Sequence, residues 1–263
     1  MIWIVNRKKL AAALGCIALV AAAAALCPLL AGPGAVTAGA AKRELPIYRV
    51  DVGEEKVVAL SFDAAWGDEK TQGILDILAQ HQAKATFFLV GFWVDAYPQQ
   101  VQAIDAAGME IGNHSTTHPH MSELTQEQVL QEVALTNEKI TALTGQVPVV
   151  FRPPYGDYDN GVIQTVRALG MEPVQWDVDS LDWKNQGAQA IIRQVTENVR
   201  PGSIILFHNN SDAILEALPA VLTALEQQGY RFTTVSGLLA DGPYTISHDG
   251  TQVPLEQAPS PAA

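Results

Sequence analysis

Residues 42–263 contain no cysteine, because the only two in the sequence, Cys16 and Cys27, precede them. A chain without thiols forms no disulfide, no zinc site built from cysteines and no thiol nucleophile. These three kinds of site are therefore excluded from the larger part of the protein.

Basic residues are also scarce. Three of the 16 lysines and arginines are Arg7, Lys8 and Lys9, so residues 42–263 carry 13 basic side chains against 28 acidic ones. Such an acidic surface repels the phosphates of nucleic acids and the headgroups of anionic membranes. We therefore expect no nucleic-acid partner, and we expect any membrane contact to be made by the N-terminal segment alone.

The first charged residues are followed by a long run that has no charge at all. The basic stretch 6–9 precedes residues 10–30, which are rich in Ala and Leu and are interrupted only by Pro28. This pattern predicts an export signal peptide or a membrane anchor over residues 1–41, and hence a secreted or membrane-anchored protein outside the cytoplasm. Small residues around Ala40 favour cleavage, whereas the length of the run also suffices to span a bilayer. Neither cysteine lies in a lipidation context, which disfavours a lipoprotein.

Apolar side chains make up 48% of the 263 residues, enough to build a buried core. From Val57 onward, short apolar runs alternate with segments of helical period, which predicts an α/β fold: a parallel sheet or barrel with helices outside, in about seven strand–helix units. The expected strands are Val57–Asp63, Ala85–Val90, Glu110–Asn113, Val147–Arg152, Glu172–Val178, Ser203–His208 and Phe232–Val235. The expected helices cover residues 69–80, 98–107, 126–143, 160–169, 188–199, 213–228 and 236–240.

Local signals mark the ends of several of these helices. Thr125 and Gln128 have the spacing of a capping box, Pro98 suits a first helical turn, and glycines such as Gly145 follow helices as stops. The same signals predict one domain over residues 56–240, preceded by a linker at 42–55. The proline-rich residues 241–263 are predicted to be a flexible tail.

Rare polar residues follow the predicted strands, and the carboxyl ends of parallel strands meet on one face of an α/β barrel. His114 and His118 are four residues apart, so both imidazoles can face one side and share a divalent metal, although such pairs also occur on plain surfaces. His120 is a competing third imidazole, but its place beyond Pro119 predicts that it faces solvent.

Two further strand ends carry residues suited to acid–base chemistry. Arg152 precedes two prolines, and on that rigid turn it can hold a carboxylate in a bidentate contact or form a surface salt bridge. His208 closes the apolar run 204–207. A histidine there is either a satisfied core residue or, next to an aspartate from a neighbouring strand, a proton donor.

In this order the motifs resemble the five-motif series of the polysaccharide deacetylases, the NodB-homology or carbohydrate esterase 4 family, over about residues 55–240. The motifs are Phe62-Asp63, His114 to His118, Arg152-Pro153-Pro154-Tyr155-Gly156, Asp182-Trp183 and Leu206-Phe207-His208. The sequence of residues 61–67 further resembles that of the sporulation-type branch of this family in Gram-positive bacteria. The resemblance implies a distorted (β/α) barrel, the NodB-homology fold. It also implies removal of N-acetyl groups from amino-sugar polymers, either peptidoglycan or chitin-like, with a divalent metal for which zinc is the expected ion.

Carried over position by position, the resemblance implies a base and a metal site. Asp63 would be the general base that activates the attacking water, and Arg152 would keep its carboxylate ionised. His114 and His118 would be metal ligands. The metal would make the water more acidic and would polarise the acetyl carbonyl.

The resemblance also implies an acid and a binding pocket. His208 would protonate the leaving amine, with Asp182 orienting its imidazole. The backbone N–H of Tyr155 would stabilise the oxyanion of the intermediate. Trp183 and Leu206 would form the walls of the pocket that takes the acetyl methyl group.

The sequence departs from the family pattern at Ala64, where family members usually carry a second aspartate that is the third metal ligand. An alanine has no lone pair, so the loss of this carboxylate should weaken metal binding. Asp68 is one candidate replacement, but it equally suits the N-cap of the following helix. Asp63 could also turn to the metal, which would leave the role of base unfilled.

Two functions from different classes remain open. The first is a metal-assisted N-deacetylase, and it is favoured because a binding protein needs no acid and base. The second is a family member that binds glycan without turnover, and a purely structural barrel is a distant third. Among the aromatic residues, Trp66, Trp93, Tyr155 and Trp183 could stack on sugar rings, whereas Trp93 and Tyr97 could equally be core residues.

Overall fold

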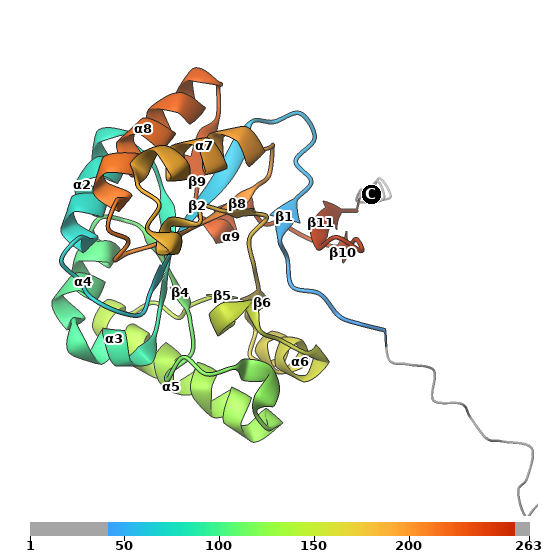
Figure 1. The fold of residues 1–263 in the computed structure, drawn as a ribbon. Helices are drawn as coiled ribbons and strands as arrows, with labels where there is room; N and C mark the ends of the chain where they lie inside the picture. Colours follow the sequence, from blue (N-terminus) through green and yellow to red (C-terminus); the bar gives the residue numbers. More distant parts are fainter. Residues whose placement is uncertain (1–41, 256–263) are drawn as a thin grey trace, which may run out of the picture. The chain divides into compact units, whose positions relative to one another are not determined.

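A computed structural model describes residues 42–255, and its main feature is a parallel sheet around which helices are arranged (Figure 1). Within these residues the sheet has eight strands, in the order β6-β5-β4-β3-β2-β8-β7, with β9 paired to β2. Every paired neighbour in it is parallel. The strands are β2 (Val57–Ala64), β3 (Ala85–Leu89), β4 (Glu110–Asn113), β5 (Val150–Phe151), β6 (Glu172–Pro173), β7 (Val178–Asp179), β8 (Ile204–His208) and β9 (Arg231–Thr233).

Helices follow the strands along the chain and pack on one another around the sheet. They are α2 (Thr71–Gln80), α3 (Gly91–Ala96), α4 (Pro98–Ala106), α5 (Gln126–Thr144), α6 (Asn160–Ala168), α7 (Ala188–Asn198), α8 (Ile214–Gln227) and α9 (Val235–Leu238). Helices α7 and α8 lie side by side, α8 also packs on α2, and α5 packs on α4 and α6. In the described part of the chain, none of these helices combines the length and the apolar character needed to cross a bilayer.

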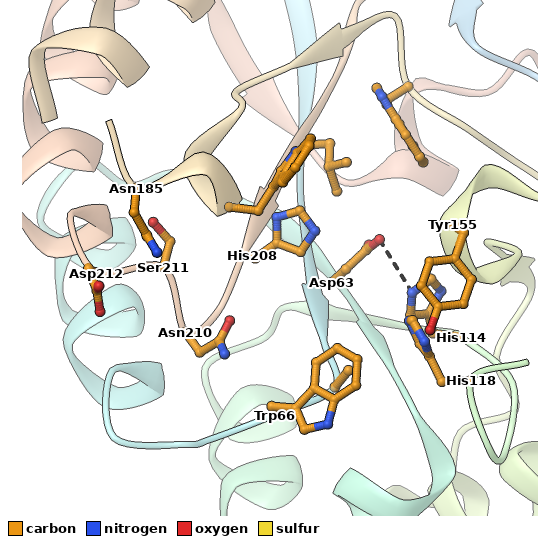
Figure 2. Close-up of a pocket in the computed structure, with 14 residues that line it drawn as sticks. Asp63, Trp66, His114, His118, Tyr155, Asn185, His208, Asn210, Ser211 and Asp212 are labelled. Carbon is orange, nitrogen blue, oxygen red and sulfur yellow. Dashed lines mark ion pairs between the residues drawn. The ribbon is translucent and has the colours of Figure 1, made fainter. Parts of the chain in front are cut away.

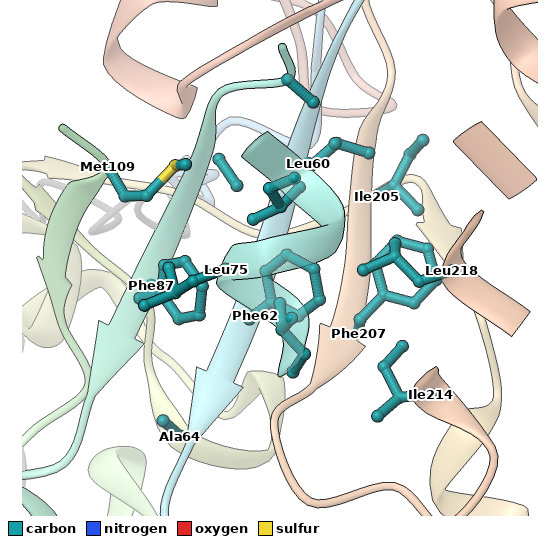
Figure 3. Packing of buried hydrophobic residues seen from close by; sticks show 14 of the residues in the cluster. Leu60, Phe62, Ala64, Leu75, Phe87, Met109, Ile205, Phe207, Ile214 and Leu218 are labelled. Atoms are coloured by element: carbon teal, nitrogen blue, oxygen red, sulfur yellow. The ribbon is translucent and has the colours of Figure 1, made fainter. Parts of the chain in front are cut away.

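Strand β2 is central because all eight of its residues are buried. Its even-numbered residues, including Phe62, belong to the core between sheet and helices, where the Phe62 ring stacks on Phe87 at 5.0 Å and on Phe207 at 5.4 Å (Figure 3). Side chains alternate along a strand, so Asp63 points to the opposite face. Its register partner on β8 is His208, which places a carboxylate and an imidazole side by side at the ends of two strands.

The barrel is distorted because the sheet does not close on itself. Strands β6 and β7 are its two edges, although they are consecutive in the sequence. The single strand predicted over Glu172–Val178 was therefore wrong: the chain crosses from one edge to the other between them. The α/β barrel of strand–helix units was predicted correctly. The strand boundaries were predicted wrongly at its open side, where β6 and β7 form the two edges of the sheet.

Residues 42–55, predicted to be a linker, are part of this fold. Ile47 is completely buried and pairs with Val174 at the open side, with hydrogen bonds of 3.0 Å to the carbonyl of Pro173 and 2.7 Å from the amide of Gln175. Strand β1 (Arg49–Val50) follows at once. The prediction was wrong because a short segment can be ordered entirely by pairing with distant residues.

Residues 244–254, predicted to lie in a flexible tail, form two strands. Strand β11 (Thr251–Pro254) pairs in parallel with β1 and antiparallel with β10 (Tyr244–Ile246), so the first and last strands of the described chain lie side by side (Figure 1). Thr251 and Gln252 are buried. The tail prediction was wrong over this range because proline content says nothing of pairing with a strand some 200 positions earlier in the chain. The predicted targeting segment at 1–41 lies outside the described residues.

Most other predicted elements agree with the structure to within a few residues. The capping box of Thr125 and Gln128 is confirmed, Pro98 opens α4, and Gly145 ends α5 with φ 74°. The strand expected at Val147–Arg152 is only two residues long, since Pro148 has no N–H to donate to a neighbouring strand. Helix α3 was not predicted.

Gly202 joins the segment around β1 to the barrel. Its N–H donates to Val57 O at 2.8 Å, its carbonyl accepts from Val50 N at 3.0 Å, its φ is +78°, and a Cβ atom would lie 1.8 Å from Val50 O. Gly53 has a similar φ of +61° but open space around it.

We expect Gly202→Ala to lower the free energy of unfolding by more than about 3 kcal/mol and Gly53→Ala by about 1 kcal/mol, as measured by urea denaturation. Equal losses would show that the close approach to Val50 is not a constraint.

Candidate active site

A pocket of about 660 Å³ opens at the carboxyl ends of β2, β4 and β8 (Figure 2). Seven of the nine predicted site residues line it, namely Asp63, His114, His118, Tyr155, Trp183, Leu206 and His208. The other two, Arg152 and Asp182, are buried and contact residues of the pocket wall. The structure thus brings all nine together.

Asp63 lies at the centre of this pocket, and its carboxylate is held by Arg152. Arg152 Nη1 donates to Asp63 Oδ1 at 2.7 Å, and both side chains are buried. Burial, the largest single cause, would raise the pKa of Asp63, but the charge and hydrogen bond of Arg152 together with the neighbouring imidazoles outweigh it, so the pKa is lowered. The carboxylate is therefore ionised at neutral pH and can accept a proton.

Arg152 is itself held on several sides. Its Nη2 donates to Ser61 Oγ at 2.9 Å and to Gln175 O at 3.0 Å, and its guanidinium lies 4.1 Å from the Phe88 ring centroid. Ser61 in turn donates to the Ile205 carbonyl at 2.7 Å. The alternative of a surface salt bridge for Arg152 is therefore wrong, because its charge lies in the interior of the barrel.

His208 faces Asp63 from the neighbouring strand and is held by Asp182. The imidazole Nδ1 lies 2.7 Å from Asp182 Oδ1, and the His208 backbone N–H donates to Asp182 Oδ2 at 2.8 Å. Burial would lower the pKa of His208, but the hydrogen bond and negative charge of Asp182 outweigh it, so the pKa is raised. Because the carboxylate only accepts, Nδ1 carries a proton and Nε2 is the atom that can exchange one with a ligand.

His114 lies on the other side of Asp63 and is neutral. Its Nδ1 lies 2.7 Å from the Arg152 carbonyl, which only accepts, so Nδ1 carries the proton and Nε2 has a free lone pair. Burial lowers the pKa of His114. Its Nε2 lies 3.4 Å from Asp63 Oδ2, the contact drawn as a dashed line in Figure 2. Two acceptors that face one another at this distance need a cation or a proton donor between them.

His118 completes the pair of imidazoles. Its ring centroid lies 5.0 Å from that of His114, its backbone is left-handed (φ 58°), and its buried Nδ1 has no hydrogen-bond partner. Burial and the neighbouring His114 lower the pKa of His118 to about 4, so it too is neutral at pH 7. Glu132 fixes the loop between the two histidines by accepting from the backbone N–H groups of Thr116 and Thr117.

These donors fit a divalent metal at two positions. Two neutral imidazoles are suitable ligands for a divalent metal, and the hydrogen bond from His114 to a backbone carbonyl is typical of metal-binding histidines. The third position is missing: Ala64 does not line the pocket and instead packs in the core beside Phe62. Within residues 42–255 no group of three or more His, Cys, Asp or Glu side chains is arranged for a metal.

Asp68 does not replace the missing ligand. It does not line the pocket, and its Oδ2 accepts from Gln100 Nε2 at 3.1 Å. The alternative of a helix N-cap is also wrong, because α2 begins later, at Thr71, and its N-cap is Lys70. Only the backbone carbonyl of Asp68 meets the helix, by accepting from Thr71 N at 3.0 Å.

The remaining predicted residues divide between pocket and core. Trp66 lines the pocket, whereas Trp93 is completely buried and Tyr97 packs against the core. His120 is exposed as predicted, and its ring stacks on that of Tyr155 at 4.4 Å. Six residues that line the pocket were not among the predicted site residues: Ala65, Trp176, Asn185, Asn210, Ser211 and Asp212. Of these, Asn210, Ser211 and Asp212 follow His208 closely, and this proximity was the available signal.

Comparisons with known proteins identify relatives of this chain. A family model described as polysaccharide deacetylase matches residues 51–174. A peptidoglycan-N-acetylglucosamine deacetylase of Bacillus cereus is 36% identical over 190 residues, which cover 70% of this chain and 89% of that protein. The chain belongs to the polysaccharide deacetylase family.

Two other relatives bear on whether members of this family are active. The uncharacterised protein YlxY of Bacillus subtilis (strain 168) is 37% identical, and the match covers 74% of this chain but only 60% of YlxY. The structure of BA3943 from Bacillus anthracis, described as a CE4 family pseudoenzyme, is 36% identical with a TM-score of 0.71 and covers 73% of this chain and 68% of its own. A mutant of BA3943 is described as having restored enzymatic activity. This polysaccharide deacetylase family therefore includes both active and inactive relatives of the chain.

The contact between His208 and Asp182 predicts a pH-dependent stability. Because the pKa of folded His208 is raised, protonation favours the folded state; this stabilisation is complete below the ordinary pKa of about 6.5 and is lost as the pH rises through the folded pKa. We expect Asp182→Asn to lower the free energy of unfolding most at acidic pH and less at alkaline pH, in urea titrations across that range. Glu226→Gln, which changes the more exposed contact to His81, is the control and should cost under about 1 kcal/mol. A loss from Asp182→Asn that is independent of pH would contradict the assignment.

Proposed function

We propose that the protein hydrolyses the N-acetyl groups of amino sugars in a cell-wall polysaccharide, with peptidoglycan as the substrate class. One observation carries this proposal. A carboxylate held ionised by Arg152 and an imidazole held by Asp182 face the same pocket from adjacent strand ends. Their pKa values are shifted in opposite directions, as a base and an acid require.

Asp63 is the general base of this proposal. It accepts a proton from a water molecule as that water attacks the acetyl carbonyl carbon. The Oδ1 atom is engaged by Arg152, so Oδ2 is the oxygen available for the proton. Arg152 acts as a positioning residue, because it fixes the carboxylate and keeps it ionised without touching the substrate.

His208 is the general acid of this proposal. As the C–N bond breaks, its Nε2–H protonates the departing amine, and the products are acetate and a free amino sugar. Asp182 stabilises the imidazolium and fixes its orientation. The left-handed turn at Tyr155 (φ 58°, ψ 9°) lies at the pocket edge, and its backbone N–H is the proposed donor to the oxyanion. A divalent metal held by His114 and His118 would supply positive charge beside the carbonyl oxygen.

Glycan binding without turnover is the second candidate, and Ala64 favours it. The side chain at this position offers no metal ligand, and a related structure of the same fold is described as a pseudoenzyme. The second candidate leaves unexplained why a complete base and acid, each with its buried partner, face the pocket. We therefore keep hydrolysis as the proposed function.

The proposal also covers the location of the protein, its metal and its biological role. The N-terminal segment 1–41 would export the protein or anchor it, so that residues 42–255 act outside the cytoplasm. Zinc is the proposed metal, because two imidazoles are among its preferred ligands. The motif at 61–67 supports a role in sporulation through its resemblance to that branch of the family.

The experiment that tests hydrolysis is acetate release by the full-length protein from N-acetylated peptidoglycan and chitin oligomers, with and without added zinc or cobalt. Metal content is measured on the same samples. Metal-dependent release of acetate is the expected result. Binding of glycan without any acetate, on both substrates and with both metals, would replace hydrolysis by the second candidate.

A further inference from the structure

The loop that joins the proposed metal ligands His114 and His118 has an unfavourable backbone conformation. Ser115 (φ 68°) and His118 (φ 58°) both lie in the left-handed region, although neither is a glycine. Residues other than glycine rarely adopt this conformation, and it persists only where surrounding contacts hold it. Relaxation of the backbone at His118 would move its imidazole, whose ring centroid lies 5.0 Å from that of His114. The loop therefore needs partners outside itself to keep the two imidazoles together.

Helix α3 supplies one set of these partners. Residues 114–120 belong to neither a helix nor a strand, so a regular pattern of hydrogen bonds does not hold them. At the start of α3, Gly91 N donates to Ser115 O at 2.9 Å and Phe92 N donates to Thr116 O at 3.2 Å. A Cβ atom at Gly91 would lie 2.9 Å from Thr116 Cα, so the loop packs directly on the backbone of α3. These contacts hold carbonyl groups of the loop.

Helix α5 holds the N–H groups of the loop through one side chain, Glu132. Its Oε2 accepts from Thr116 N and from Thr117 N, both at 2.8 Å, and its Oε1 accepts from Thr117 Oγ1 at 2.8 Å. The Thr116 hydroxyl also donates to the backbone carbonyl of Glu132 at 2.8 Å. Hydrogen bonds to a carboxylate are roughly twice as strong as those between neutral groups. One carboxylate thus holds three donors in the middle of the loop.

The carboxylate of Glu132 acts on the site only through this loop. Glu132 is not among the described residues that line the pocket, so it offers no ligand of its own. Within residues 42–255 it also forms no ion pair with a lysine, arginine or histidine. Its side-chain contacts are therefore committed to Thr116 and Thr117.

We infer that Glu132 is a positioning residue for metal binding: it holds the loop so that the imidazole of His118 stays beside that of His114. The inference rests on the proposed function in one respect, that these two imidazoles bind a divalent metal. Residues that orient the ligands of a metal typically change its affinity by about 10–100-fold. Because Ala64 supplies no third ligand, binding depends more heavily on the two imidazoles, and their prior arrangement matters correspondingly more.

The test is calorimetric titration of the full-length protein with zinc, and we expect Glu132→Ala to weaken zinc binding by roughly tenfold or more. Two conservative variants separate position from charge. Glu132→Gln keeps the length of the side chain and an oxygen that can accept from both Thr116 N and Thr117 N, so its affinity should stay within about threefold of the wild type. Glu132→Asp keeps the charge but is one methylene shorter, so it should lose about as much affinity as Glu132→Ala.

Hydrogen exchange of the metal-free protein gives a second measurement. The amide protons of Thr116 and Thr117 should exchange at least about tenfold faster in Glu132→Ala than in the wild type, because they have lost their acceptor. Glu138→Ala is the matched control, since it removes an exposed carboxylate from the same helix. It should leave both the zinc affinity and the exchange of these two amides unchanged. Circular dichroism of each variant separates a local change in the loop from a loss of the fold.

Three results would overturn the inference: zinc affinity that Glu132→Ala leaves intact, wild-type protein that binds no zinc, or affinity that Glu132→Asp retains and Glu132→Gln loses. The last result would mean that Glu132 acts through its charge and not by positioning the loop. Acetate release is measured on the same proteins. Zinc binding that depends on Glu132 without any acetate would overturn the proposed hydrolysis and leave this inference standing, whereas acetate release with zinc affinity independent of Glu132 would do the reverse.

Discussion

Asp63→Asn is expected to reduce acetate release by about 10²–10⁴-fold, the usual contribution of a general base. An amide has no basic oxygen, so the variant has no group that can take the proton of the attacking water. The asparagine oxygen can still accept the hydrogen bond from Arg152, which lies at 2.7 Å from Asp63 Oδ1. The variant should therefore fold, although the buried charge of Arg152 loses its partner and the free energy of unfolding falls.

The measurement compares initial rates of acetate release with circular dichroism of the same protein. Asp95→Asn provides a matched control, since it makes the same substitution at the more exposed contact to Lys139 and should leave the rate unchanged. His208→Ala removes the acid instead of the base, and a loss of similar size is expected. Acetate release near the wild-type rate in either folded variant would remove that residue from the proposed chemistry.

The sequence predicted the candidate site better than it predicted the edges of the fold. Asp63 and His208 follow two short apolar runs, and such runs become strands of a parallel sheet whose carboxyl ends meet on one face. Strand periodicity therefore places both side chains at the same edge of the sheet, whereas their direct approach depends on the pairing of β2 with β8. That Arg152 lies buried between Ser61, Phe88 and Asp63 does not follow from periodicity, because it depends on packing across the interior of the barrel.

The parts that could not be predicted depend on contacts between distant residues. Ile47 is buried because it pairs with Val174 at the open side of the sheet, between the edge strands β6 and β7. No residue pattern near Ile47 in the sequence predicts that the sheet is open there. Strands β1 and β11 are each stabilised by pairing with the other, across some 200 residues. Short strands of this kind carry too few residues for a periodic pattern.

The position of the Ala64 side chain likewise required the structure. From the sequence alone, Ala64 occupies the position at which family members usually carry an aspartate that binds the metal. In the structure it is completely buried and shares the core face of β2 with Leu60 and Phe62 (Figure 3). Restoring the carboxylate therefore affects the core as well as the pocket, because the new side chain must leave the apolar face to reach His114 and His118.

Ala64→Asp is expected to make stability depend on metal. A carboxylate that is buried without a partner costs several kcal/mol, so the variant should be less stable than the wild type in the presence of a chelator. Added zinc should recover this loss, because a ligand that binds only the folded state stabilises it by about 2.7 kcal/mol at 100 times its dissociation constant. The measurements are thermal unfolding with chelator and with zinc, and calorimetric titration of zinc.

Ala64→Asn separates charge from size in this experiment. It introduces a side chain of nearly the same volume with a neutral, weaker ligand, so it should lose stability in the chelator and recover less of it with zinc. Tighter zinc binding in the aspartate variant alone would show that His114 and His118 lack an anionic third ligand, and acetate release should rise with zinc occupancy. Equal zinc affinity in wild type and both variants would mean that another group already fills the third position. Asp63 is the nearest carboxylate for that role, at 3.4 Å from His114 Nε2, and a carboxylate bound to the metal would no longer be free to act as the base.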